Sequence, residues 1–260
     1  MSDSAHATNG SAASIEADSV DERAAAESDG GTETGEYTFD DLSVVMGTYN
    51  EEEAIETVLT DIAEVTNGEA EVVCVDSSED RTPEIAREHG ARVIEQEPQG
   101  YGVAVRAALL AADRPVVVTT DCDDTYPMER LPDLLEGIND GADVVSGDRL
   151  YYGAETMPDL NRLGNRGFAL LASVLMGRRV HDTTTGMRAY RRELVRKVEW
   201  TENTGLSAEL LIRPLMRGYD VRELPIEYRE RKGETKLDPL QGGAAIAKSI
   251  LKVCLEERVR

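Results

Sequence analysis

The sequence predicts an α/β fold with a mostly parallel, doubly wound sheet flanked by helices. Beyond residue 40, short Val-rich apolar runs recur along the chain, as is typical of buried parallel strands. Stretches with helical spacing of apolar residues separate these runs. At 260 residues, the chain is long enough for one such domain.

Strands and helices are expected to alternate in the first part of this domain. The predicted strands are Leu42–Met46, Glu71–Val75, Ala91–Ile94, Pro115–Thr120 and Ala142–Ser146. The predicted helices between them are Glu52–Val65, Pro83–Glu88, Val103–Ala112 and Glu129–Ile138. Pro at the start of the second helix suits a first turn, where a missing N–H costs no hydrogen bond. Such alternation implies right-handed crossovers, and therefore parallel strands.

The pattern is less regular after Gly147. Helices are expected at Asn161–Met176 and Ser207–Arg217, and short strands at Met187–Tyr190 and Val221–Tyr228. The last apolar residues, within Leu240–Val259, lie close to helical spacing. This spacing predicts an amphipathic helix over residues 240–260.

The composition divides the chain into three parts. Residues 1–40 are rich in Ser, Ala, Gly, Asp and Glu and contain almost no large apolar side chains. Such a segment cannot bury enough surface to offset its ordering entropy, so we expect a disordered acidic tail. Residues 41–239 then form the main domain, and residues 240–260 the C-terminal helix.

The charge balance excludes general nucleic-acid binding. The chain carries 28 basic and 51 acidic residues, a formal net charge of −23, whereas nucleic-acid binding needs a cationic surface. An acidic, Lys-poor surface resembles proteins from salt-loving cytoplasms. The three cysteines lie far apart, so neither a disulfide framework nor a zinc site is indicated. We expect a cytoplasmic protein without a signal peptide or membrane span.

Polar residues follow several predicted strands, at the edge where open α/β sheets bind ligands. Asp121 and Asp123 come directly after Pro115–Thr120, and in an extended chain their side chains point the same way. Two carboxylates so close repel unless a proton or a cation lies between them. Mg²⁺ or Mn²⁺ suits such oxygen ligands together with substrate phosphates. The pair therefore predicts a divalent metal site, with a solvated acidic turn as the simpler alternative.

Of two other interpretations of this region, the first is a rival and the second fails. The residues 121–125 also read D-x-D-x-T, the pattern of phosphatases in which Asp121 would attack phosphorus. That pattern belongs on a first strand, whereas here it follows the fourth. Gly100-Tyr101-Gly102 could suggest a nicotinamide site, but it does not directly follow a strand and lacks the third Gly.

Several motifs in order resemble the family-2 glycosyltransferases of the GT-A fold, and most of all the dolichyl-phosphate sugar synthases. The resemblance spans roughly residues 41–250. The matching blocks are Thr48-Tyr49-Asn50-Glu51-Glu52, Val75–Thr82, Asp121-Cys122-Asp123, Gly147-Asp148-Arg149, Asp182–Arg188 and Arg229–Leu237. The resemblance implies a nucleotide-diphospho-sugar transferase fold. It also implies metal-dependent, inverting transfer of a hexose from GDP-mannose or UDP-glucose to a polyprenyl or dolichyl phosphate.

The resemblance assigns roles to individual residues. The residues expected to bind the nucleotide are Thr48, Tyr49, Glu51, Asp76, Gly102 and Asp121. Asp121 and Asp123 are expected to hold the metal. The residues expected to act in catalysis are Asp123, Asp182, Arg149 and Lys236. Arg188, Arg229 and Lys236 are expected to bind the acceptor phosphate.

A cluster of cations supports the last assignment from the residues alone. Residues 222–236 hold five cations in a chain that otherwise avoids them. Arg and Lys bind phosphate strongly, so the cluster indicates an anionic ligand. The alternative is that these cations pair with neighbouring glutamates on a solvated loop.

The nature of the acceptor decides whether a general base is needed. The oxygen of a lipid phosphate is already ionised at neutral pH, so a single displacement at the anomeric carbon needs none. A hydroxyl acceptor would need one, with Asp182 the first choice and Glu209 the second. A soluble family-2 transferase acting on a small molecule or a polysaccharide is the alternative function, and a non-enzymatic nucleotide sensor is a third.

A lipid acceptor also implies contact with a membrane. The segment Leu240–Val259 could lie along the inner face of the cell membrane, with Lys248, Lys252 and Arg258 near the headgroups. A helix with such a stripe more often packs against its own domain, and we expect that packing here. Peripheral membrane association is the alternative.

Overall fold

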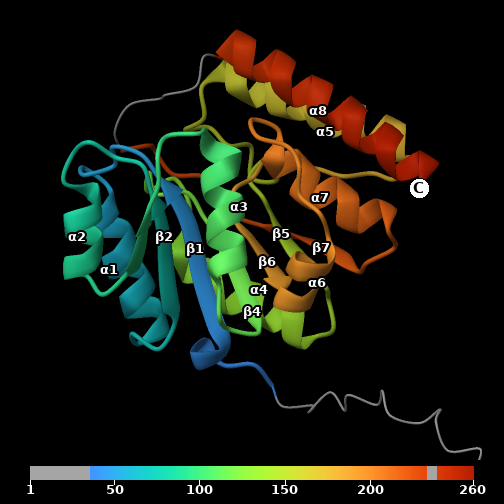
Figure 1. Ribbon diagram of the computed structural model, residues 1–260. Coiled ribbons are helices and arrows are strands. Elements are labelled where there is room, and N and C mark those ends of the chain that lie inside the picture. The colour runs from blue at the N-terminus through green and yellow to red at the C-terminus, as the bar shows by residue number, and fades with distance from the viewer. Residues whose placement is uncertain (1–35, 233–238) are drawn as a thin grey trace, which may run out of the picture. The chain divides into compact units, whose positions relative to one another are not determined.

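The computed structural model of the protein describes residues 36–232 and 239–260 (Figure 1). The chain from Glu36 to Arg260 forms one compact unit, which contains both the predicted main domain and the C-terminal helix. Residues 1–35 of the predicted tail lie outside the described residues. A short 3-10 helix, Phe39–Asp41, leads into the first strand.

The centre of the unit is a seven-stranded sheet in the order β3-β2-β1-β4-β6-β5-β7. Its strands are β1 (Leu42–Thr48), β2 (Glu71–Asp76), β3 (Arg92–Glu95), β4 (Val116–Thr119), β5 (Val144–Asp148), β6 (Arg188–Arg191) and β7 (Val221–Pro225). The pairs β1–β2, β2–β3, β1–β4 and β5–β7 are parallel. Strand β6 runs antiparallel between β4 and β5. The mostly parallel sheet confirms the predicted fold class.

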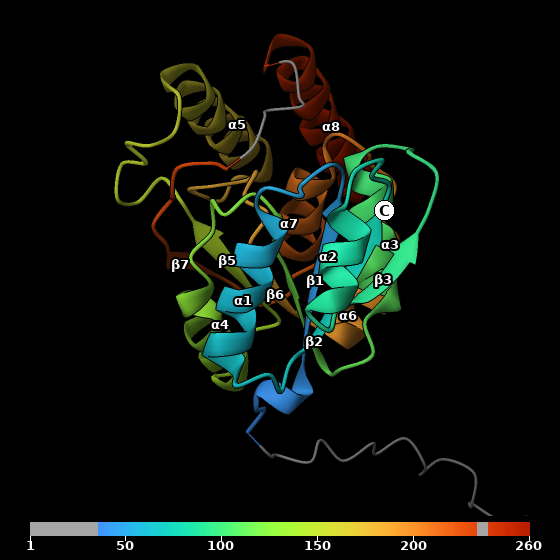
Figure 2. The ribbon, with the colours of Figure 1, turned by 90° about the vertical axis from the view of Figure 1, so that its left-hand side faces the viewer.

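Helices cover both faces of the sheet (Figure 2). One face packs against α1 (Ile55–Thr66), α2 (Thr82–Glu88) and α4 (Leu131–Asn139). The other face packs against α3 (Tyr101–Ala111), α6 (Arg192–Lys197) and α7 (Leu206–Met216). Alternating Val, Leu and Met side chains of the strands fill these two cores, which agrees with a sheet buried on both faces.

Two long helices form a further layer beside α7 (Figure 1). They are α5 (Asp159–Met176) and α8 (Pro239–Val259). The two pack against each other, and α8 also packs against α7. Among the described residues, no helix combines the length and the apolar character that a membrane crossing requires.

Candidate functional site

A cavity of about 1130 Å³ opens where the chain leaves β1 and β4, and it extends between α5 and α8. Its polar end is lined by the segments that follow β1, β4 and β5, as expected at the carboxyl ends of parallel strands. Its other end is lined by apolar side chains, namely Met157, Leu160, Phe168, Ala244 and Ile246. The cavity therefore suits a ligand with one polar and one apolar part.

The polar end contains two neighbouring carboxylates. The Asp121 carboxylate accepts a hydrogen bond from the Tyr101 hydroxyl at 3.0 Å. The Asp123 carboxylate, which is buried, accepts from the hydroxyl of Thr125 at 2.6 Å and from its amide at 3.2 Å. Shielding from solvent and the adjacent Asp123 charge raise the pKa of Asp121 from 3.8 to about 6. The Asp123 charge thus opposes the ionisation of Asp121.

This pair fits a small divalent cation. The ligands that such a cation prefers are carboxylate oxygens, completed by phosphate oxygens and water. Within residues 36–232 and 239–260, no cluster of three or more His, Cys, Asp or Glu side chains is placed to hold a metal. A metal at Asp121 and Asp123 would therefore need oxygen ligands from the substrate.

A basic segment after β7 lies against the carboxylate pair. The Arg231 guanidinium forms an ion pair with Asp123, and the Lys232 amide donates to the Asp123 carbonyl at 3.0 Å. The Lys232 ammonium binds the Asp124 carboxylate at 2.7 Å. Arg231 is among the residues that line the cavity. It therefore places a positive charge beside the two carboxylates.

A second guanidinium reaches the cavity from the end of β5. Arg149 binds the buried Asp182 carboxylate through Nε at 2.7 Å and Nη2 at 2.9 Å. It also lies over the Tyr228 ring, 5.6 Å from the centroid. Burial alone would raise the pKa of Asp182, but the Arg149 charge holds it below its usual value. Asp182 is thus ionised and fixes the direction of Arg149.

Comparison with known proteins identifies the family. The model of the family described as glycosyl transferase family 2 matches residues 43–199. The chain is 78% identical over 225 residues to the dolichyl-phosphate hexose transferase of Haloferax volcanii, covering 86% of this chain and 99% of that protein. The chain belongs to glycosyl transferase family 2.

The similarity to more distant proteins is consistent with this family assignment. The transferase is 31% identical over 210 residues to the dolichol-phosphate mannosyltransferase of Pyrococcus furiosus, covering 75% of this chain and 59% of that protein. It also resembles a glucosyl-3-phosphoglycerate synthase from Mycobacterium tuberculosis, solved with Mn²⁺, UDP-glucose and phosphoglyceric acid. The TM-score is 0.66 at 25% identity, over 83% of this chain and 79% of that chain. The transferase has the GT-A fold, and the phosphatase and nicotinamide alternatives are wrong.

The structure brings six of the twelve site residues predicted from the sequence to this cavity. The predicted site residues that line it are Thr48, Tyr49, Glu51, Asp121, Asp123 and Arg149. Asp76 lies behind this wall, where its carboxylate accepts from the Thr48 hydroxyl at 2.6 Å. The transferase can therefore use Asp76 to orient Thr48. Lys236 lies outside the described residues.

Three other residues singled out in the sequence lie away from the cavity of the transferase. Arg188 is fully buried and donates to Ser146 Oγ and to two carbonyls, which favours a structural role over phosphate binding. Arg229 pairs with Glu129, Asp61 and Asp124 on the side of the carboxylate loop. Glu209 is fully buried, and its carboxylate accepts five hydrogen bonds from Thr201, Glu202 and Arg213. A carboxylate so fully engaged is poorly placed to act as a base.

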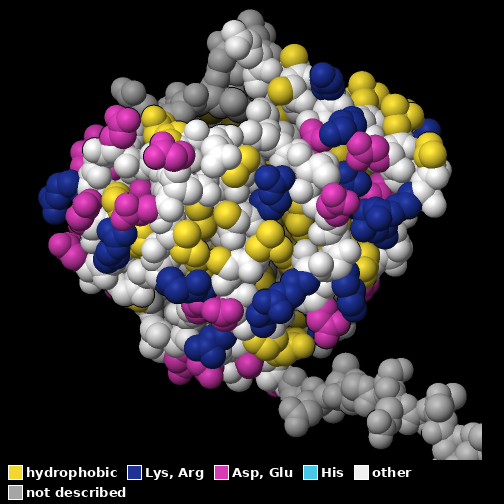
Figure 3. All heavy atoms as spheres, viewed as in Figure 1, with side chains coloured by type: hydrophobic (Ala, Val, Ile, Leu, Met, Phe, Trp, Pro, Cys, Tyr) yellow, Lys and Arg dark blue, Asp and Glu magenta, His cyan; other side chains and the backbone are white. Residues whose placement is uncertain are grey.

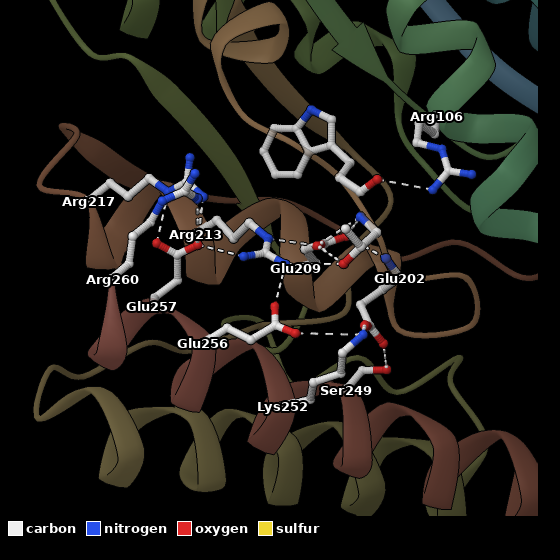
Figure 4. A network of polar contacts seen from close by, with 12 residues as sticks. Arg106, Glu202, Glu209, Arg213, Arg217, Ser249, Lys252, Glu256, Glu257 and Arg260 are labelled. Carbon is white, nitrogen blue, oxygen red and sulfur yellow. Dashed lines mark hydrogen bonds and ion pairs between the residues drawn. The ribbon is translucent and has the colours of Figure 1, made fainter.

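Glu209 belongs to a buried polar network that joins α7 to α8 (Figure 4). Arg213 connects Glu209, at 2.7 Å, with Glu256 at 2.8 Å and Glu257 at 2.5 Å. Glu202 binds Ser249 and Lys252 of α8. The network therefore fixes the segment 199–205 against α8. That segment forms part of the cavity wall through residues 203–205.

Asn203 extends this connection to the first turn of α3. Its side chain accepts from the Gly102 amide at 2.9 Å and donates to the Gln99 carbonyl at 2.9 Å. The first amides of a helix lack intrahelical partners, so Asn203 caps α3 from a distant segment. Gly102 allows this approach, because a Cβ there would lie 2.3 Å from the Asn203 carbonyl oxygen. Tyr101, which binds Asp121, stands in this same turn.

Replacing Asn203 with Ala is expected to raise the KM for the sugar donor more than it lowers kcat. The change leaves the Gly102 amide unpaired and loosens the turn that holds Tyr101, at a cost of about 1–3 kcal/mol in the free energy of unfolding. Asn139→Ala is a matched control, since Asn139 makes the same two kinds of bond to the Tyr37 backbone. Steady-state kinetics and chemical denaturation measure both variants. An equal change in KM in the control would show that lost stability alone is responsible.

Three residues of the cavity wall carry no distinctive signal of their own in the sequence. Tyr101, Asn203 and Arg231 all line the cavity of the transferase. Tyr101 was considered only within Gly100-Tyr101-Gly102. Arg231 belonged to the predicted cationic cluster, where adjacent arginines could not be told apart. No local pattern in the sequence marks Asn203.

Proposed function

We propose that this chain transfers a hexose from a nucleotide-diphosphate sugar to a polyprenyl or dolichyl phosphate. The observation that carries the proposal is the two-ended cavity, whose charged end lies at Asp121 and Asp123 and whose apolar end lies between α5 and α8. A lipid phosphate is a ligand with both characters. The name of the 78% identical Haloferax volcanii transferase supports the same acceptor class.

The donor is proposed to bind at the carboxylate end. A Mg²⁺ or Mn²⁺ ion held by Asp121 and Asp123 would supply positive charge to the departing diphosphate. Arg231, at the same carboxylates, can also bind a diphosphate oxygen. Thr48, Tyr49 and nearby Ser77 line this end and can contact the nucleoside. The solved relative with Mn²⁺ and UDP-glucose supports a metal-dependent donor site of this kind.

The acceptor phosphate is proposed to bind at Arg149, which lines the cavity. A guanidinium fixed by a buried carboxylate gives a phosphate a directed, charge-assisted partner. The phosphate oxygen is ionised at neutral pH and attacks the anomeric carbon without a general base. The new bond forms as the bond from that carbon to the donor diphosphate breaks, and the configuration inverts. In this proposal Asp182 positions Arg149 and does not act as a base.

Membrane contact is proposed through the outer side of α8. Hydrophobic side chains gather along this helix at the upper right of Figure 3. Among the side chains of α8, Leu251, Leu255 and Val259 are large, apolar and exposed. Two of the cations expected near headgroups are engaged elsewhere, because Lys252 binds Glu202 and Arg258 donates to the Leu175 carbonyl. The apolar side of α8 is therefore proposed to touch the membrane, at the inner face of the cell membrane.

A transfer assay with the full chain tests this function. GDP-mannose or UDP-glucose with a labelled hexose is mixed with a short-chain polyprenyl phosphate and Mn²⁺ or Mg²⁺. We expect label in the lipid extract with one of the donors, and none after chelation of the metal. Label that stays in the aqueous phase with every donor, or that enters only a soluble acceptor such as glycerol 3-phosphate, would refute the lipid acceptor.

A further inference from the structure

Helix α5 separates the main cavity from a second one, which lies on its other side. Arg166, Leu170 and Ser173 of α5 line the second cavity, of about 570 Å³. The α5 residues that line the main cavity are Leu160, Asn161, Gly164, Asn165 and Phe168. The chain after α5 adds Arg179 and His181 to this second cavity. Nothing in the proposed transfer reaction uses these residues.

Two guanidiniums in the second cavity have no partner. Within residues 36–232 and 239–260, Arg166 and Arg179 form neither a hydrogen bond nor an ion pair through their side chains. Their neighbours along the chain do, since Arg162 pairs with Asp159 and Arg178 donates to the Val221 carbonyl. In a chain with 51 acidic and 28 basic residues, partners for two arginines are abundant. Two unpaired guanidiniums in one cavity therefore point to an anionic ligand from outside the chain.

The acidic groups near the second cavity are already engaged. Asp148 is buried at its wall, where its carboxylate accepts from the Leu150 amide at 2.9 Å. Glu223 accepts from the His181 amide and contacts the His181 ring, both at 2.7 Å. The guanidiniums of Arg166 and Arg179 remain available at the exposed rim, where both residues are exposed.

Apolar side chains surround this rim. Leu163, Leu170 and Val174 are each at least 66% exposed, and their spacing of seven and four residues places them on one side of α5. Arg166 follows Leu163 by three residues and precedes Leu170 by four, so it lies on the same side of α5. Tyr151, also 66% exposed, lines the cavity beside Leu170. A surface that offers unpaired cations among exposed apolar side chains matches the interface of a bilayer, where headgroup phosphates lie above acyl chains.

We propose that Arg166 and Arg179 bind the phosphate of an anionic membrane lipid, distinct from the acceptor, so that the outer side of α5 lies on the bilayer. The headgroup phosphate occupies the rim of the second cavity, and Leu163, Leu170 and Val174 enter the acyl boundary. This inference rests on the proposed function only in that a lipid acceptor brings the enzyme to a membrane. The main cavity, on the opposite side of α5, then opens beside the same surface.

Vesicle flotation with the full chain tests this site, at a salt concentration in which thermal unfolding shows the protein to be folded. Vesicles of phosphatidylcholine alone are compared with vesicles that contain phosphatidylglycerol. The wild type is expected to float with the anionic vesicles. The double variant Arg166→Ala, Arg179→Ala is expected to partition about thirtyfold more weakly, as for two cations lost from an anionic surface. The control Arg87→Ala, Arg222→Ala removes the same charge from arginines that pair with Glu95 and Asp220.

Several results would overturn the proposal. These are equal flotation of the double variant and the wild type, an equal loss in the control variant, or equal binding of the wild type to neutral vesicles. A calorimetric titration with glycerol 3-phosphate that depends on the two arginines, without any effect on flotation, would assign the site to a soluble phosphate instead. Transfer to a short-chain polyprenyl phosphate in solution is measured in parallel and is expected to be unchanged in the double variant. Absence of transfer by the wild type would refute the proposed function alone, because flotation is measured independently of it.

Discussion

Asp123→Asn is expected to lower hexose transfer by about a thousandfold or more, because a bound metal ion contributes several kcal/mol to stabilising the charge of the leaving group. The amide oxygen of Asn can still accept from the Thr125 hydroxyl and amide, so the local turn is kept. The variant removes the negative charge that pairs with Arg231 and that would hold the proposed metal. Initial rates at saturating metal and donor measure the loss.

The neighbouring residue provides a matched control for this experiment. Asp124→Asn removes one carboxylate charge at the next position, where the side chain binds Lys232 and Arg229 rather than lining the cavity. Asp124 has a positive φ of 60°, a conformation that Asn adopts readily. We expect this control to stay within about threefold of the wild-type rate, since Asp124 does not line the cavity and its Asn side chain can still accept hydrogen bonds from Lys232 and Arg229. A transfer rate for Asp123→Asn within tenfold of the wild-type rate would disprove the metal assignment.

Asp182→Asn is expected to lower the free energy of unfolding by about 3–5 kcal/mol, because it leaves the buried Arg149 charge without its partner. For a folded unit of this size, that loss corresponds to a fall in Tm of roughly 6–20 °C. The low pKa of Asp182 gives the sign of the pH dependence. The stabilisation is present above the ordinary value of 3.8 and is lost as the pH falls through the lower folded-state pKa. Thermal unfolding at pH 7 and across the acid range measures both effects.

The double variant Arg149→Met, Asp182→Leu separates stability from function at this pair. Apolar side chains of similar volume recover much of the stability that the single variant loses, because no unpaired charge remains buried. Transfer should nevertheless stay low in the double variant, since the proposed acceptor contact is gone. A free energy of unfolding within about 1 kcal/mol of the wild type for Asp182→Asn would contradict the buried-pair interpretation.

The sequence by itself determined the fold class and the location of the carboxylate site. Val-rich runs indicate a strand that is buried on both faces. The polar residues that follow these runs indicate the edge of the sheet that binds ligands. For this reason the sequence alone places Thr48, Asp121, Asp123 and Arg149 at that edge, and the structure gathers all four at one cavity. The residue pattern at Asp121 and Asp123 suffices because neighbours in the chain are neighbours in space.

Only the tertiary structure decided how distant segments meet. The antiparallel insertion of β6 between β4 and β5 depends on pairing partners that lie far apart in the sequence. Arg231 faces Asp123 while Arg229 turns to Glu129, and nothing in their shared cationic segment distinguishes them. Asn203 accepts a hydrogen bond from the Gly102 amide in the first turn of α3, although 101 residues separate the two in the sequence. A local pattern records which side chains are buried or charged, whereas the partner of a buried charge or an unpaired amide is fixed only when the whole chain is packed.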